Sequence, residues 1–187
     1  MTSVLAHPGF HGKLPCAGDF VQRRLPATFV APWDATMQRL QWQVRDQAPA
    51  APVWNFVLAP GLCGACAWAG ALVASRDRVG RRFPLTIAAV LPLGACHPHW
   101  LGAAAALLES AAAMDDVDSF DRACQALAAT AMAPTAQWPP PPRAGALWWS
   151  SRDHGHSGVW VATDGLPGPQ QAAMLLGQGE AASEPVR

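Results

Sequence analysis

The order of the predicted elements indicates an α/β (α+β) fold, a single-domain sandwich with a mostly antiparallel central sheet flanked by helices. The predicted strands over 53–92 follow one another through short turns, which favours antiparallel hairpins. Few strands alternate with helices, so a doubly wound parallel sheet is not expected. The chain has 187 residues, 51% of them apolar, and can bury ~70% of its unfolded surface in its own core.

The N-terminal part is predicted to be extended structure followed by a helix. Residues 8–24 read as two extended segments with a turn at 15–18, where proline and glycine favour chain reversal. The first helix is expected within 26–47, with Thr28 as its N-cap and Pro32 tolerated only near the first turn. Its apolar stripe would consist of Phe29, Trp33, Met37, Leu40 and Val44.

Three strands are predicted next, at 53–59, 67–75 and 83–92, where β-branched and aromatic residues are frequent. The turns between them lie at 60–64 and 76–82. Consecutive strands joined by such short turns are expected to form antiparallel hairpins.

The second half is predicted to contain helices, a proline-rich connection and two more strands. Asp115, Asp116 and Asp118 stand at the start of the second helix, where carboxylates suit the helix dipole. We expect a single domain over 1–177 and a flexible C-terminal tail over 178–187. The predicted elements are helices at 98–113 and 116–132, a polyproline segment at 133–143, strands at 145–151 and 157–163 and a helix at 167–177.

The charge balance excludes some classes of function. Thirteen basic and thirteen acidic residues cancel, which argues against a nucleic-acid-binding protein and against a general attraction to anionic lipid. No segment resembles a signal peptide or a transmembrane helix. Five cysteines without a regular framework fit reduced thiols, so we expect a cytoplasmic protein without membrane insertion.

The predicted turn at 76–82 concentrates positive charge. Four of the thirteen basic residues fall within seven positions there, and guanidinium groups bind carboxylate or phosphate through paired hydrogen bonds. One interpretation is a docking site for an acidic or phosphorylated partner. The other is an internal salt network, for example to Asp19 or Asp34. The charged residues of the turn are Arg76, Asp77, Arg78, Arg81 and Arg82.

The segment Gly9–Phe20 is glycine-rich but does not match a phosphate-binding loop. No serine or threonine follows Lys13, and no helix begins directly behind it. We expect a strand and turn in which Phe10 and Phe20 fill the core. Lys13 and Asp19 have no packing role there, so they are predicted to pair with each other or to face a partner.

A metal- or cysteine-dependent hydrolase is the alternative function. The single C-x-x-C motif, Cys63 and Cys66, would need two more ligands for zinc, and His97 and His99 could supply them. The motif precedes a strand, whereas redox motifs of this kind start a helix. Two buried thiols remain the more ordinary interpretation. The polar segment 150–158 is interpreted as a hairpin loop.

Two adjacent tryptophans mark the strand predicted at 145–151. Trp148 and Trp149 must point to opposite faces of a strand. One ring should belong to the core. The other is either covered by a helix or exposed as an interface anchor.

Six segments occur in a specific order and combination. With them the chain resembles the TagF (ImpM) family of type VI secretion system-associated proteins from about Gly9 to Leu176. The segments are GFHGKLPCAGDF, LPATFVAPWD, PVWNFVLAPGLCG, AWAGALVASRDRVGRRFPLTIA, ALWWSS and GLPGPQQAAMLL.

The resemblance implies a regulatory function. It implies a cytoplasmic negative regulator that acts after translation on type VI secretion and is linked to a forkhead-associated (FHA) scaffold protein of the system. It also implies an α/β sandwich around a largely antiparallel sheet, with no catalytic residues, no metal and no cofactor. We therefore expect a non-catalytic accessory protein that represses secretion by binding an FHA-domain protein.

The candidate residues for partner binding or for a charged network surround the hairpin turns. Lys13 and Asp19 are predicted to gather with Asp34 and the arginine-rich turn as one charged surface. Trp149 is the candidate aromatic anchor. The full set is Lys13, Asp19, Asp34, Arg76, Asp77, Arg78, Arg81, Arg82 and Trp149.

Overall fold

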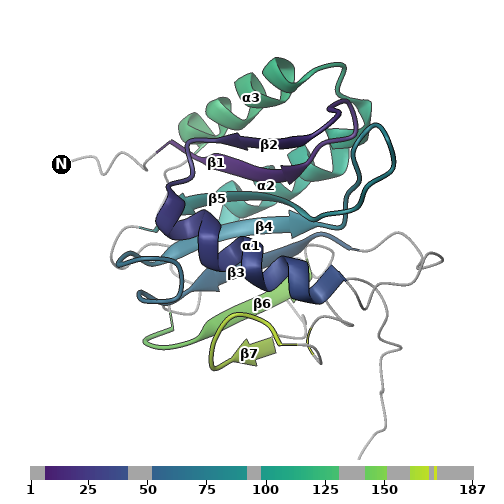
Figure 1. Cartoon of the computed structure of the whole chain (residues 1–187). Helices are drawn as coiled ribbons and strands as arrows, with labels where there is room; N and C mark the ends of the chain where they lie inside the picture. The colour runs from purple at the N-terminus through teal and green to yellow at the C-terminus, as the bar shows by residue number, and fades with distance from the viewer. Residues whose placement is uncertain are drawn as a thin grey trace, which may run out of the picture.

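Seven strands form one sheet in which every neighbouring pair is antiparallel. The computed structural model describes residues 7–41, 52–91, 98–130, 142–150, 161–168 and 171. The strand order is β2-β1-β5-β4-β3-β6-β7 (Figure 1). The strands are β1 (Gly9–Lys13), β2 (Phe20–Arg23), β3 (Trp54–Leu58), β4 (Trp68–Val73), β5 (Leu85–Val90), β6 (Ala146–Ser150) and β7 (Val161–Thr163).

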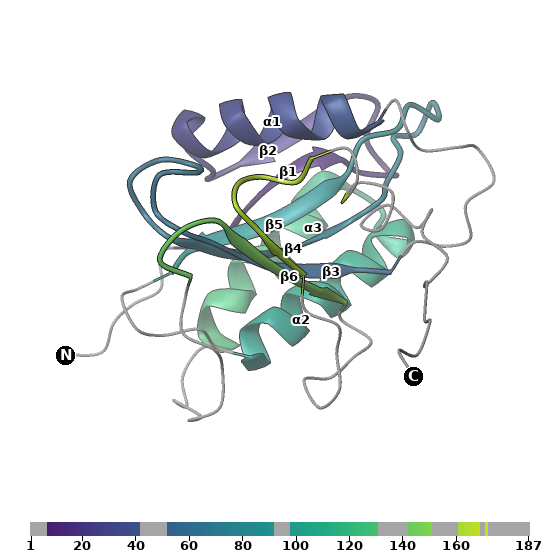
Figure 2. The ribbon, with the colours of Figure 1, turned by 90° about the horizontal axis from the view of Figure 1, so that it is seen from below.

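Helices cover both faces of this sheet. Helix α1 (Ala27–Gln41) crosses one face, and α2 (Pro98–Glu109) and α3 (Val117–Ala126) lie on the other. Figure 2 shows the three layers edge-on. Short 3-10 helices follow α2 and α3, at Ser110–Ala113 and Leu127–Thr130. The arrangement confirms the predicted α+β sandwich.

Helix α1 packs through the predicted aromatic stripe. Phe29, Trp33 and Met37 are buried, and the Trp33 indole Nε1 donates to Thr86 Oγ1 of β5 at 3.1 Å. The rings of Trp33 and Phe56 lie 4.8 Å apart. These contacts anchor α1 across the central strands, because a buried indole N–H needs a partner and finds it on the sheet.

The start of α1 differs from the prediction. The backbone N–H groups of Phe29 and Val30 both donate to the Pro26 carbonyl, so Thr28 lies inside the helix and is not its N-cap. Pro32 lies in the second turn. The ring of Pro26 fixes φ and starts the helix two residues earlier than the side-chain pattern indicated.

The core on the opposite face of the sheet is rich in leucine and alanine. Alanines of α2 pack against β4 and β5 together with Phe10, whose ring meets Phe120 of α3 edge-on at 5.0 Å. Asp116 lies at the start of α3 as predicted, and its carboxylate also caps the helix by accepting the Ser119 N–H at 2.6 Å. None of the described helices has the length and apolar run needed to cross a bilayer.

The three strands predicted over 53–92 are confirmed as β3, β4 and β5, and the strand predicted at 145–151 as β6. Only the end of the strand predicted at 157–163 is described, as β7. Several predicted segments lie outside the described residues, wholly or mostly. They are the polyproline segment, the end of the first helix, the loop 151–156, the helix at 167–177 and the tail.

Candidate functional site

The turn between β4 and β5 is organised around the carboxylate of Asp77. Its Oδ1 accepts the backbone N–H groups of Val79 at 3.1 Å and Arg81 at 2.9 Å, and its Oδ2 accepts Arg81 Nε at 2.8 Å. The Gly80 N–H donates to the Asp77 carbonyl, with Gly80 at a positive φ of 88°. An aspartate that bonds the backbone ahead of it closes a turn by itself, and glycine accepts the required conformation.

Lys13 joins this turn to the end of β1. Its Nζ lies 2.9 Å from Asp77 Oδ2, and the two residues are only 3% and 2% exposed. Ion pairs buried this deeply require hydrogen bonds to the remaining donors and acceptors. Asp77 obtains them from the turn backbone and from Arg81, so its charge is fully compensated within the chain.

The same contacts determine the protonation of Asp77. Burial raises the pKa of its carboxyl, but hydrogen bonds from Lys13, from the Arg81 backbone and from the Arg81 guanidinium outweigh burial. The pKa of Asp77 is therefore held well below its ordinary value. The Asp77 carboxylate is therefore ionised at neutral pH and stabilises the turn through its hydrogen bonds.

The loop between β1 and β2 packs along this turn. The Arg78 N–H donates to the Ala17 carbonyl at 2.8 Å, and the Arg81 guanidinium donates to the Gly18 carbonyl. Asp19 Oδ1 lies 3.5 Å from Lys13 Nζ and 3.7 Å from Arg81 Nη2. The two turns thus form one continuous surface at one end of the sheet (Figure 1).

Phe20 is an exposed aromatic residue at this surface. Its side chain is 44% exposed, in contrast to the prediction that it fills the core with Phe10. The Lys13 Nζ lies 4.1 Å from the ring centroid, and the rings of His11 and Phe83 lie 5.7 and 4.9 Å away. A cation over the face of an aromatic ring is a favourable contact, so Phe20 is held in place without being covered.

Asp34 lies apart from the arginines. Its Oδ1 meets Nε2 of His11 at 3.1 Å, and its Oδ2 accepts from Gln38 at 2.9 Å. Among the described residues it forms no hydrogen bond or ion pair with Lys13 or with the turn 76–82. Within the described part of the chain, Asp34 is connected to the charged network through His11, which stacks on Phe20.

His11 and Phe20 were not predicted as site residues. His11 and Lys13 lie two residues apart on β1, and Phe20 pairs with Lys13 across β1 and β2. Residues two apart on a strand share a face, and directly paired residues lie side by side. The register of the hairpin was the missing information, because the sequence does not show which residue of β2 faces which residue of β1.

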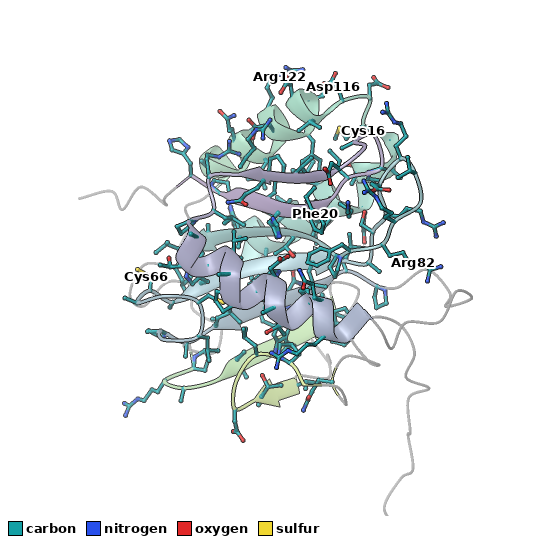
Figure 3. The ribbon with its side chains drawn as sticks, viewed as in Figure 1. Cys16, Phe20, Cys66, Arg82, Asp116 and Arg122 are labelled. Atoms are coloured by element: carbon teal, nitrogen blue, oxygen red, sulfur yellow. The ribbon has the colours of Figure 1, made fainter. Side chains whose placement is uncertain are left out.

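The arginines of the turn fall into two groups. Arg81 is bound by Asp77, as described, and Arg82 is half-buried with contacts within the chain. Arg76 and Arg78 are exposed, and their side chains form no hydrogen bond or ion pair with the described residues. Arg76 and Arg82 are paired directly across the turn. Figure 3 shows Arg82 at the same end of the sheet as Cys16 and Phe20.

Both tryptophans of β6 are buried. Trp148 packs in the core beneath α1, and Trp149 belongs to the core on the α2 side with 4% exposure. Trp149 pairs with Asn55 of β3, and three strands separate β6 from β1 in the sheet. The structure therefore places Trp149 away from the charged turn and in the interior.

The residues of the alternative function are not gathered around one point in the described structure. Cys63 is buried, and burial raises the pKa of its thiol to about 12, whereas Cys66 and His99 are exposed. His97 lies outside the described residues. No group of three or more His, Cys, Asp or Glu side chains within the described ranges could hold a metal ion.

Comparison with known proteins places this fold in a family. Residues 9–139 match the family model of the TagF N-terminal domain, described as type VI secretion system-associated. The crystal structure of PA0076 from Pseudomonas aeruginosa PAO1 is similar, with a TM-score of 0.70 and 31% sequence identity over 96% of this chain and 98% of that one. No curated protein matches the chain significantly. Since the family model spans more than half of the sequence, the chain belongs to the TagF N-terminal domain family of type VI secretion system-associated proteins.

Proposed function

We propose that this protein is a non-catalytic accessory protein that represses type VI secretion after translation. It acts in the cytoplasm by binding another protein of the secretion system, an FHA-domain scaffold. Membership of a type VI secretion system-associated family supports a role in type VI secretion. The observation that carries the binding role is the exposure of Arg76 and Arg78 on a turn that Lys13 connects to the exposed ring of Phe20.

The chemistry of the charged turn supports binding over catalysis. Lys13, Asp77 and Arg81 use their polar atoms on one another and on the backbone, so their charges brace the turn. A catalytic acid, base or nucleophile needs a group that can reach a substrate. The groups accessible to a partner are the guanidinium groups of Arg76 and Arg78 and the ring of Phe20. Arginine and aromatic side chains are typical anchors of protein interfaces.

Deletion of the gene tests the repressor role. We expect the deletion strain to secrete more type VI substrate than wild type, with unchanged amounts of the secretion proteins in the cell. Reintroduction of the wild-type chain should return secretion to its original level. Lost secretion on deletion would instead indicate a structural component of the apparatus and would overturn the proposal.

A pull-down from the same cells tests the partner. The wild-type chain should co-purify with the FHA-domain protein of the system, and the purified pair should re-form a complex. Excess secretion without any such complex would retain the repressor role and reject the FHA partner.

A further inference from the structure

We propose that the segment recognised by this protein is an acidic stretch of its partner that carries an apolar side chain. The apolar side chain packs on Phe20 and Val79 while neighbouring carboxylates pair with Arg76 and Arg78. We name these four residues the turn surface. This inference rests on the proposed function and adds the chemistry of the docked segment.

The turn surface contains the exposed large hydrophobic side chains of the described structure. Phe20 is 44% and Val79 is 67% exposed. They come from turns far apart in the sequence, but the bonds of Arg81 and Arg78 to the β1–β2 loop hold the two turns together. Exposed apolar side chains among charged groups are the usual composition of a recognition site.

The surface carries an excess of positive charge. Segments 13–20 and 76–82 contain five basic residues and two carboxylates, which leaves an excess of three positive charges. Arg76 and Arg82 also stand directly opposite each other across the turn. The exposed guanidinium groups of Arg76 and Arg78 can bind carboxylates through paired hydrogen bonds. A carboxylate-bearing ligand is the complementary chemistry.

The positive charge extends over a short distance only. Burial and the carboxylates of Asp116 and Asp115 raise the pKa of the Cys16 thiol, whereas Arg78 lowers it, so the acidic start of α3 lies close to the turn. Figure 3 shows Asp116 and Cys16 beside each other at this end of the molecule. A long polyanion such as nucleic acid, or an anionic membrane, would meet these carboxylates. A short acidic peptide segment avoids them.

The turn is held in its bound shape before any partner arrives. Asp77 receives hydrogen bonds from two backbone groups and from Arg81, and the buried Lys13 fixes it to β1. Binding to such a surface orders few additional groups, which favours affinity.

The neighbouring edge strand β2 is a less suitable docking site for a partner strand. Its Phe20 N–H donates to the Asp19 carboxylate at 2.7 Å, and its Gln22 carbonyl accepts from the Arg23 side chain at 2.9 Å. Capped backbone groups discourage strand addition at that edge.

Site-specific photo-crosslinking in the native cells tests the proposal directly. The variant Val79→p-benzoylphenylalanine places the crosslinker within the turn surface. The matched control is Ala65→p-benzoylphenylalanine, at an exposed position next to Cys66, which Figure 3 shows at the opposite end of the sheet from Arg82. We expect an adduct at position 79 and not at 65, and mass spectrometry should find a peptide rich in Asp and Glu with an apolar residue.

Charge reversal gives the quantitative test. The double variant Arg76→Glu/Arg78→Glu should bind the crosslinked partner at least about 10-fold more weakly, with reduced dependence on salt. Arg143→Glu is the matched control, since Arg143 is exposed and precedes Gly145, whose carbonyl accepts the Ala59 N–H at the far end of β3. This control should bind like wild type. Both proteins should retain the wild-type thermal midpoint.

The outcomes separate this inference from the proposed function. The proposal of an acidic segment would be overturned if no adduct formed at position 79. It would also be overturned by an adduct to a neutral or basic segment, to nucleic acid, to lipid or to a second copy of this chain. So would unchanged affinity of the double variant. In each of these cases an excess of secretion in the deletion strain would leave the repressor role standing. Unchanged secretion on deletion, with an acidic adduct at position 79, would reject repression and retain the docking chemistry.

Discussion

The Nζ of Lys13 lies 2.9 Å from Oδ2 of Asp77, and this contact connects the end of β1 to the turn between β4 and β5. Lys13 also lies over the ring of Phe20 on β2. One buried ammonium group therefore touches a carboxylate, an aromatic ring and two turns. The shape of the turn surface depends on this residue, although Lys13 itself is almost inaccessible to a partner.

Replacement of the ammonium group should destabilise the fold. In Lys13→Met the side chain keeps its length, but Asp77 loses one of its charged partners while retaining the bonds to Val79 and Arg81. Removal of one member of a buried pair should lower the free energy of unfolding by about 3 kcal/mol. Urea unfolding measures this change. An unfolding free energy equal to that of wild type would mean that the pair is not buried in solution.

Acidification should weaken the same contact. The pKa of Asp77 is depressed in the folded protein, so its contribution to stability is present above the ordinary carboxyl pKa of 3.8 and is lost as the pH falls below that value. We expect Asp77→Asn to be less stable than wild type at pH 7 and the difference to shrink between pH 5 and pH 3. Urea midpoints at four pH values measure it. A difference that grows on acidification would show that Asp77 is not held ionised by its partners.

The sheet and helices could be predicted because each depends on local patterns. Alternating or continuous apolar runs identified β3, β4 and β5, and the spacing of Phe29, Trp33 and Met37 identified α1. The aspartates around Asp116 indicated the start of α3, because carboxylates suit the positive end of the helix dipole. The N-cap of α1 was placed two residues too late, because Thr28 has a typical N-cap side chain whereas the first hydrogen bonds of the helix go to the Pro26 carbonyl.

The candidate site could be predicted only in part. It depends on the register of the β1–β2 hairpin and on which helix covers which face of the sheet. The spacing of the arginines identified the turn, but the inward direction of Asp77 follows from its hydrogen bonds to Val79 and Arg81. Asp34 pairs with His11 because α1 crosses the sheet at that point. Trp149 is covered because α2 lies on its face of the sheet. None of these placements is encoded in neighbouring residues.

Gly12 allows Lys13 to reach the turn. It has a φ of +137°, and a Cβ at this position would lie 2.0 Å from the Pro84 carbonyl oxygen. Gly12→Ala should therefore force β1 away from the chain that leads out of the turn, and we expect little folded protein. Gly61→Ala is the matched control, because φ is also positive there but no atom lies within 4 Å. Backbone strain alone should make that variant less stable by about 1 kcal/mol. Equal thermal midpoints of the two variants would contradict the close approach.

The thiols should differ in reactivity according to burial. Cys66 is exposed, whereas burial raises the pKa of the Cys63 thiol to about 12 and that of Cys124 to about 11. Iodoacetamide at pH 8 should therefore label Cys66 in the native protein and leave Cys63 and Cys124 unmodified until urea is added. Peptide mass spectrometry distinguishes the sites. Rapid labelling of native Cys63, or stoichiometric zinc in purified protein, would revive a hydrolase that uses Cys63, Cys66, His97 and His99.

Reversal of the charge of Arg76 should have opposite effects on stability and on binding. Arg76 pairs with Arg82 across the turn, so Arg76→Glu places a carboxylate directly opposite an arginine. Cross-strand pairs of opposite charge contribute up to about 1 kcal/mol, so urea unfolding should show unchanged or slightly increased stability. The same variant should bind the partner more weakly, because its carboxylate repels an acidic segment. Arg76→Gln separates the two effects, because it removes the positive charge of Arg76 without adding a negative one. Affinity should therefore fall in the order wild type, Arg76→Gln, Arg76→Glu. Affinities that follow stability instead would show that Arg76 acts through the fold and does not touch the partner.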